Sequence, residues 1–317
     1  MRDFKKFLAV FLRISISIAM LIFLFRMVDL RNLVSAVKEA RFSLLALACG
    51  VFSLNYILAF VRWRELFTVV KIRPPDRKLI TAFTGGTVFN LFLPTSIGGD
   101  LVRSIDLSVN TRKPREVVAT VIMDRLSGFA GLMILAFSAS VFGWRLLEDR
   151  VVLSSLIIMV TALAAILFIL FNSFLYGKIS GFLKNPDAGK IKEALAGVHE
   201  HLHNFKKHRN LILGNIVLSV LIQSVTPVVF YIMARAMGLP GGIVQFLIVM
   251  PIIGAISLVP ISIGGLGVRD AAVVFFFAKI GIARDAAFAM SLLSFVFIVL
   301  YSAAAGLVYV SLARERK

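Results

Sequence analysis

Six apolar runs in this chain are each long enough to cross a lipid bilayer, at residues 7–28, 43–61, 116–142, 151–172, 211–236 and 286–312. The hydrocarbon core of a bilayer needs about 20 mostly apolar residues per spanning helix, whereas barrel strands would alternate apolar and polar residues. The chain is 59% hydrophobic and only 16% charged, so a water-soluble fold could not cover its apolar surface. We predict an all-α integral membrane protein with about six spanning helices in a single transmembrane domain over residues 1–317. The first run is too long for the apolar part of a signal peptide and is expected to be retained.

The basic residues predict an orientation. If the N-terminus is cytoplasmic, most of the 35 Lys and Arg residues fall on the cytoplasmic side, including those of a predicted cytoplasmic helical arm at about 178–209. This bias places both termini in the cytoplasm of a cell membrane protein. The formal net charge of +18 then reflects attraction to anionic lipid headgroups, and we expect no nucleic-acid partner.

One ten-residue pattern, P-x-S-I-G-G-x-x-V-R, occurs at residues 94–103 and again at 260–269. Each copy interrupts an apolar segment, at about 79–110 and 242–280, and has a predicted span on either side. The chain therefore contains two repeat units, at residues 43–142 and 211–312. Counting the crossings makes these units inverted relative to each other, as in many secondary transporters. We expect two re-entrant broken-helix hairpins that enter the membrane from opposite sides.

The residues of the pattern explain why the helices break. Proline lacks the N–H that continues a helix, paired glycines allow unusual backbone angles, and the new half-helix presents free N–H groups and a positive dipole end that suit an anion. The alternative is a hairpin that serves only tight helix packing. The candidate substrate-binding residues are Arg103, Arg269, Gly98, Gly99, Gly264, Gly265, Ser96, Ser262 and Arg125.

Other charged residues lie at membrane depth, where they are costly and usually face a cavity or a partner. Asp100, Asp124 and Asp270 are candidates for charge balance or proton coupling, and a closed structural ion-pair network is the competing interpretation. Asp124 and Arg125 point to different helix faces, so Asp124 is expected to neutralise an arginine of another element. Asp106 is three residues after Arg103 and is its expected helical partner.

Two further motifs receive a structural interpretation. Arg62 and Arg64 flank Trp63 at the edge of a predicted span and are typical of an interfacial anchor. His199, Glu200 and His203 fit the zinc-protease pattern H-E-x-x-H. That pattern lies outside every span, in a basic amphipathic segment at 187–209 without an obvious third ligand. We therefore expect no metal site, no catalytic residue and no cofactor.

Several motifs together resemble the lysylphosphatidylglycerol synthase transmembrane-region family, which is also called flippase-like or YbhN-like. They are N-L-F-L-P at residues 90–94 with G-G-D-x-x-R at 98–103, D-R-L-S-G at 124–128 and G-G-x-G-x-R at 264–269. The resemblance covers nearly the whole chain. It implies a domain similar to the one with which the multiple peptide resistance factors move an aminoacylated phospholipid between leaflets. The soluble synthase domain of those proteins is not expected here, because the chain ends at Lys317, directly after its last span.

The residues and the resemblance together predict a flippase or scramblase for a phosphate-bearing lipid, of the phospholipid or polyprenyl type. Its headgroup would be held by the two half-helix ends with Arg103 and Arg269. Two alternatives stay open. The first is a glycosyl or phosphoryl transferase for a lipid-linked substrate, with Asp100 or Asp124 as its base. The second is a non-catalytic partner of a lipid-synthesising enzyme.

Overall fold

The computed structural model describes residues 15, 18–20, 22–27, 31, 35, 37–93, 98–171, 208–258 and 266–314. This part of the chain is helical and contains no β-strand. Its elements in chain order are α3 (Phe42–Leu66), α4 (Asp76–Phe92), α5 (Gly98–Thr111), α6 (Pro114–Phe142), the 3₁₀ helix η1 (Trp144–Glu148), α7 (Arg150–Phe171), α10 (Arg209–Ala236), α11 (Ile243–Leu258), α12 (Val268–Lys279) and α13 (Arg284–Arg314). The all-helical fold class is therefore confirmed.

Four helices of the described chain are long and apolar enough to cross a membrane, namely α3, α6, α10 and α13. They correspond to four of the six predicted spans. At the predicted span 151–172, α7 is helical over 22 residues, and its described stretch Arg150–Ala165 is apolar. At 7–28, residues 15, 18–20 and 22–27 are helical, and the other residues of that run lie outside the described chain.

Each interrupted segment forms two short helices. The first gives α4 and α5, and the chain leaves α4 at Leu93, whose backbone is extended with φ −83° and ψ 139°. The second gives α11 and α12, and Gly267 precedes α12 with φ +82°, an angle that favours glycine. Helix α5 begins at the predicted glycine pair, whereas α12 begins at Val268, three residues after its pair.

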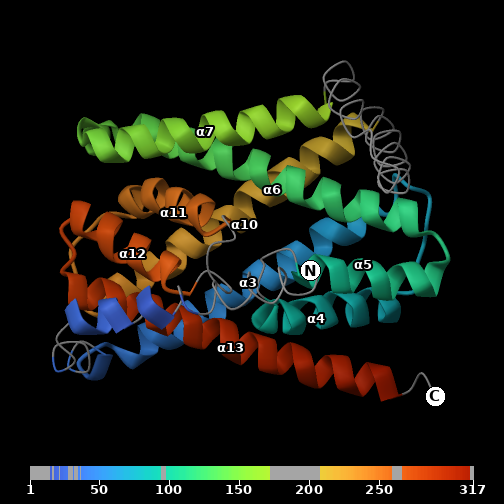
Figure 1. The fold of residues 1–317 in the computed structure, drawn as a ribbon, viewed down its shortest axis with the longest axis horizontal. Helices are drawn as coiled ribbons and strands as arrows, with labels where there is room; N and C mark the ends of the chain where they lie inside the picture. Colours follow the sequence, from blue (N-terminus) through green and yellow to red (C-terminus); the bar gives the residue numbers. More distant parts are fainter. Residues whose placement is uncertain are drawn as a thin grey trace.

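The long helices form a bundle, and the short helices lie at its two ends. Figure 1 shows α4 and α5 toward the right end and α11 and α12 toward the left end, with α3, α6, α10 and α13 running between. Helix α3 packs on α10, α4 on α5 and α13, and α11 on α6 and α12. The α4–α5 contact is close because Gly86 and Gly99 face each other, and a Cβ at Gly86 would lie 2.7 Å from the Gly99 carbonyl oxygen.

The hydrophobic core consists of two clusters. The larger joins α6, α10, α11, α12 and α13, and Phe246, Phe277 and Phe288 are its largest fully buried side chains. The smaller surrounds Trp63 and Leu66 at the end of α3 and includes residues of α4, α5 and α6. Polar side chains lie between these helices, near the middle of the bundle.

Candidate functional site

Asp124 is the centre of a buried ion-pair network between helices. Its carboxylate accepts a hydrogen bond of 2.8 Å from Nε of Arg62 on α3 and one of 2.9 Å from Nη2 of Arg103 on α5. The Asp124 side chain is 6% exposed, and those of Arg62 and Arg103 are 9% and 7% exposed. Asp124 thus neutralises arginines of neighbouring elements, as the sequence predicts, and it ties α3, α5 and α6 together.

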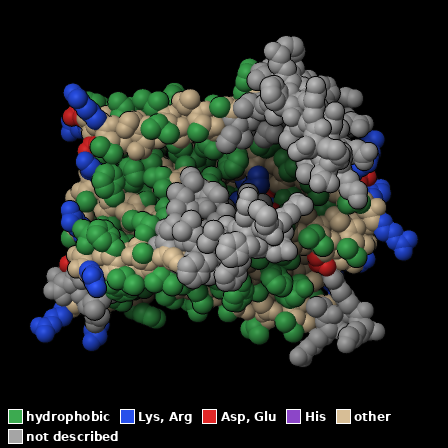
Figure 2. Space-filling model, in the orientation of Figure 1, with side chains coloured by type: hydrophobic (Ala, Val, Ile, Leu, Met, Phe, Trp, Pro, Cys, Tyr) green, Lys and Arg blue, Asp and Glu red, His purple; other side chains and the backbone are tan. Residues whose placement is uncertain are grey.

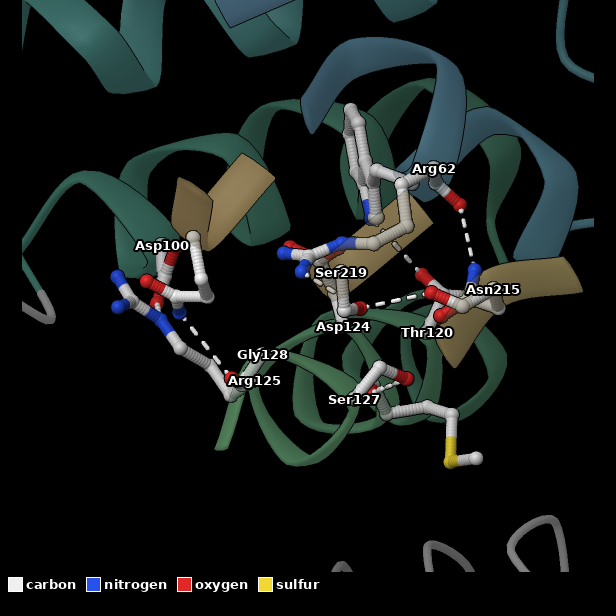
Figure 3. A network of polar contacts seen from close by, with 12 residues as sticks. Arg62, Asp100, Thr120, Asp124, Arg125, Ser127, Gly128, Asn215 and Ser219 are labelled. Atoms are coloured by element: carbon white, nitrogen blue, oxygen red, sulfur yellow. Dashed lines mark hydrogen bonds and ion pairs between the residues drawn. The ribbon is translucent and has the colours of Figure 1, made fainter. Parts of the chain in front are cut away.

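Arg62 also joins α3 to α10. Its Nη1 donates to Oγ of Ser219 at 3.0 Å, and its carbonyl oxygen accepts from Nδ2 of Asn215 at 3.1 Å. Figure 3 shows Arg62 between Asp124 of α6 and Ser219 and Asn215 of α10. Arg62 therefore connects α3 and α6, in the first half of the chain, to α10 in the second half.

The prediction of an interfacial anchor at residues 62–64 is wrong for its first two members. Arg62 is 7% exposed and Trp63 is fully buried, with the Trp63 indole N–H donating to Oγ1 of Thr120 at 3.2 Å. Helix α3 continues to Leu66, beyond the predicted span 43–61, and both side chains find polar partners inside the bundle. Only Arg64 is exposed, where it pairs with Asp76.

Asp100 provides a second carboxylate next to Asp124. It forms an ion pair of 2.9 Å with Nη2 of Arg103 and accepts a hydrogen bond from Nε of Arg125. The Arg103 guanidinium also lies over the Trp63 ring, 4.7 Å from its centroid. The expected pair of Arg103 with Asp106 is therefore wrong, because Arg103 points toward α6 and the start of its own helix. Asp106 instead accepts from Nδ2 of Asn110.

The second half of the chain has a smaller ionic pair. Nη2 of Arg269 lies 3.0 Å from Oδ1 of Asp270. Asp270 is fully buried, and it also accepts from the backbone N–H of Gly267 at 2.8 Å and from the Ser291 hydroxyl at 2.5 Å. A carboxylate in the first turn compensates the positive end of the helix, so Asp270 holds the start of α12 against α13.

A cavity of about 610 Å³ brings the two halves together. The starts of two short helices contribute to its wall, α5 through Gly99 and α12 through Arg269, and Leu266 just before α12 also lines it. Its charged lining residues are Arg62, Asp100, Arg103, Asp124, Arg125 and Arg269. Figure 2 shows basic side chains in a hollow near the middle of the visible face. Arg103 and Arg269, predicted separately from the two copies of one pattern, thus line the same space.

The arginines of this cavity differ in how far they are open to it. The side chains of Arg125 and Arg269 are 35% and 14% exposed, more than those of Arg62 and Arg103. Within the described chain, Nε of Arg103 and Nε of Arg269 are buried without a hydrogen-bond partner. A buried donor without a partner is costly, so these two N–H groups are available to donate hydrogen bonds to an added anion.

Several predicted residues lie outside the described chain. They are Ser96, Ser262, Gly264, Gly265, the histidine motif at 199–203 and nearly all of the arm at 178–209. Among the described residues, no group of three or more His, Cys, Asp and Glu side chains could hold a metal ion. Sequence reasoning missed the role of Arg62, and the available signal was a charged residue directly beside a predicted span.

One comparison with known proteins gives a match. Residues 10–306 match the family model described as the lysylphosphatidylglycerol synthase TM region. No curated protein sequence and no solved structure matches the chain significantly.

Proposed function

The chain belongs to the lysylphosphatidylglycerol synthase TM region family, and from this premise we propose that it moves a phosphate-bearing lipid between the leaflets of a membrane as a flippase or scramblase. The observation that carries the proposal is the cavity between apolar helices, lined by arginines from both halves of the chain. Charged residues at membrane depth are costly and are characteristic of substrate pathways. This cavity would give a lipid headgroup a polar route through the apolar core.

The charges of the cavity favour an anionic headgroup. Arg62, Arg103 and Arg125 face two carboxylates, Asp100 and Asp124, which leaves one positive charge in excess. In the other half of the site, Asp270 compensates Arg269. A phosphate would neutralise the excess and could accept hydrogen bonds from the two N–H groups that have no partner among the described residues.

The exposure of the arginines suggests a division of roles. Arg125 and Arg269 are the more exposed and would contact the headgroup directly. Arg103 is held by two carboxylates and by the Trp63 ring, so it would position Asp100 and Asp124 and contribute its Nε. The starts of α5 and α12 would add backbone N–H donors of the kind that bind phosphate at helix N-termini.

The arrangement of helices supports an inverted repeat with two re-entrant hairpins. The order of long, short, short and long helix occurs twice, as α3–α6 and as α10–α13. Contacts pair in the way that a two-fold axis between the units would produce, since α4 packs on α13 and α11 packs on α6. The short helices lie at opposite ends of the bundle (Figure 1). We infer hairpins that meet at the cavity from opposite membrane sides, with both termini cytoplasmic.

The alternative of a lipid-linked transferase has less support. Its candidate bases, Asp100 and Asp124, each form ion pairs with two arginines. Both carboxylates are thus already engaged by arginines of the protein itself. The family match is likewise to a TM region rather than to a synthase domain.

The proposal is tested with purified protein in liposomes that contain fluorescent phosphatidylglycerol. Transbilayer movement is followed by chemical quenching of the outer leaflet. We expect faster movement than in empty liposomes, and a loss of about tenfold to a hundredfold in Arg125→Ala and Arg269→Ala. This range corresponds to one charge-assisted hydrogen bond, about 1.5–3 kcal/mol.

The matched control is Arg145→Ala, which removes an exposed arginine outside this cavity, next to Trp144, and is expected to leave the rate unchanged. Protein liposomes that behave like empty ones with several anionic headgroups would refute the proposal. Equal rates in Arg125→Ala, Arg269→Ala and the control would refute the assigned site.

A further inference from the structure

The size of the cavity limits which part of a lipid it can hold. At about 610 Å³ it falls within the range of about 300–1,000 Å³ that holds a drug-sized ligand. A lipid with two acyl chains is larger than such a ligand. If the proposed function is correct, the cavity holds the headgroup, and the tails must leave it sideways between two helices.

Two boundaries between neighbouring helices are too closely packed for acyl tails to pass. Between α6 and α10, a Cβ at Gly131 would lie 2.7 Å from the carbonyl carbon and the Cβ of Ser219, and Gln223 donates to the Gly128 carbonyl at 3.1 Å. Between α4 and α13, Gly85 lies against the Tyr309 ring, and the two helices pack on each other far more extensively than α3 and α13 do. Separating these helices would require backbone movement.

The boundary between α3 and α13 is different. These two helices approach each other less closely than α6 and α10, which are their counterparts in the repeat. Aromatic side chains join them: Tyr56 stacks on Tyr301 with ring centroids 5.1 Å apart, and Phe52 lies 5.7 Å from Tyr301 and 6.0 Å from Phe297. Rings of this kind can separate by rotation about side-chain bonds, without a change in the helices.

This boundary also connects the cavity to the outer surface of the bundle. On the inside, Phe52 and Tyr56 of α3 and Ile298 of α13 line the cavity. On the outside, the apolar side chains of Leu54 and Ile57 on α3 are exposed, as are those of Val296 and Leu300 on α13. All of these positions lie in the middle part of two helices that are long enough to span a membrane.

We propose that the aromatic seam formed by Phe52, Tyr56, Phe297 and Tyr301 is the lateral opening through which the acyl tails of the transported lipid pass. The inference rests on the proposed function and adds the route that the tails take. The Tyr56–Tyr301 stack closes the seam in this structure. When a headgroup enters the cavity, the tails lie between the separated rings, in contact with the exposed apolar side chains outside.

Photolabelling tests the seam without requiring transport. Phosphatidylglycerol with a diazirine at the end of one acyl tail is irradiated with the wild-type protein in liposomes. We expect adducts on residues 52–57 and 296–301 that decrease when unlabelled phosphatidylglycerol is added. Ile157 and Ile158 of α7, which are 54% and 68% exposed, serve as the control, because bulk lipid should label them with less effect of the competitor. Seam labelling that competes no better than labelling of α7 would overturn the inference.

Cross-linking then tests whether the seam must open. Cys49 is the single cysteine of the chain, so Tyr56→Cys and Tyr301→Cys are introduced together in a Cys49→Ser background. They are linked with a short bifunctional methanethiosulfonate, and each single-cysteine variant receives the same reagent. We expect the link to slow lipid movement at least tenfold and a reducing agent to restore the rate. An undiminished rate of lipid movement in the linked protein would contradict the proposal that tails pass through the seam. Absence of lipid movement before linking would contradict the proposed function, and the photolabelling result would then decide the seam.

Discussion

Replacing Asp124 by asparagine tests whether the buried network stabilises the bundle. In the structure, Asp124 holds two guanidiniums whose side chains are 9% and 7% exposed, at 2.8 and 2.9 Å. Asparagine has nearly the same shape and keeps one acceptor oxygen, but it carries no charge. Asp124→Asn therefore leaves the buried Arg62 guanidinium without its compensating negative charge. Arg103 loses one of its two carboxylates and keeps Asp100.

The expected loss follows from the two contacts. Removing one partner of a buried ion pair costs about 3–5 kcal/mol, because the remaining charge is uncompensated. In domains near this size, each kcal/mol lowers the melting temperature by about 2–4 °C. We expect Asp124→Asn to melt about 10 °C below the wild type. Asp124→Asn combined with Arg62→Met should recover part of this loss, since an apolar side chain then replaces the unpaired charge.

The measurement is the thermal unfolding of purified protein in one detergent, followed by the loss of monodisperse protein. The control is Asp76→Asn, which removes a carboxylate from an exposed pair with Arg64, where the side chains are 61% and 54% exposed. Exposed pairs contribute about 0–1 kcal/mol, so a change of at most about 3 °C is expected. Equal melting temperatures for Asp124→Asn and Asp76→Asn would refute the reasoning.

Two further predictions concern packing and pH. Gly86→Ala places a methyl group against the Gly99 carbonyl and should cost about 1–3 kcal/mol by overpacking. The control is Gly50→Ala, which has nothing within 4 Å and should be neutral or slightly stabilising. Equal melting temperatures for the two variants would contradict the close α4–α5 approach. Outside the spans, the hydrogen bond from Lys279 lowers the pKa of Asp149 below its ordinary 3.8. A lowered pKa stabilises the fold above the ordinary value, and this contribution disappears as the pH falls through the native pKa. The difference in melting temperature between the wild type and Asp149→Asn should therefore be constant down to about pH 4 and vanish below it, and a difference that grows in acid would contradict this pair.

Local patterns were sufficient for much of the fold. Apolar runs predicted α3, α6, α10 and α13 to within a few residues at most ends, because a bilayer imposes a minimum length on each spanning helix. Proline and glycine predicted where the two interrupted segments, at about 79–110 and 242–280, break, because both residues act on their own backbone. The repeated pattern identified Arg103 and Arg269, which line one cavity. Each of these features depends on a short stretch of sequence and not on contacts between distant residues.

The partners of the charged residues were decided by the tertiary structure. Asp100 and Asp106 are each three residues from Arg103, so spacing alone could not choose between them. Arg103 forms its ion pair with Asp100 because that face of α5 meets α6, where Asp124 accepts a hydrogen bond from the same guanidinium nitrogen. Packing also made Arg62 part of the network, with partners on α6 and α10. Hydropathy places a residue at a depth in the membrane, but only the contact between helices determines which opposite charge it meets there.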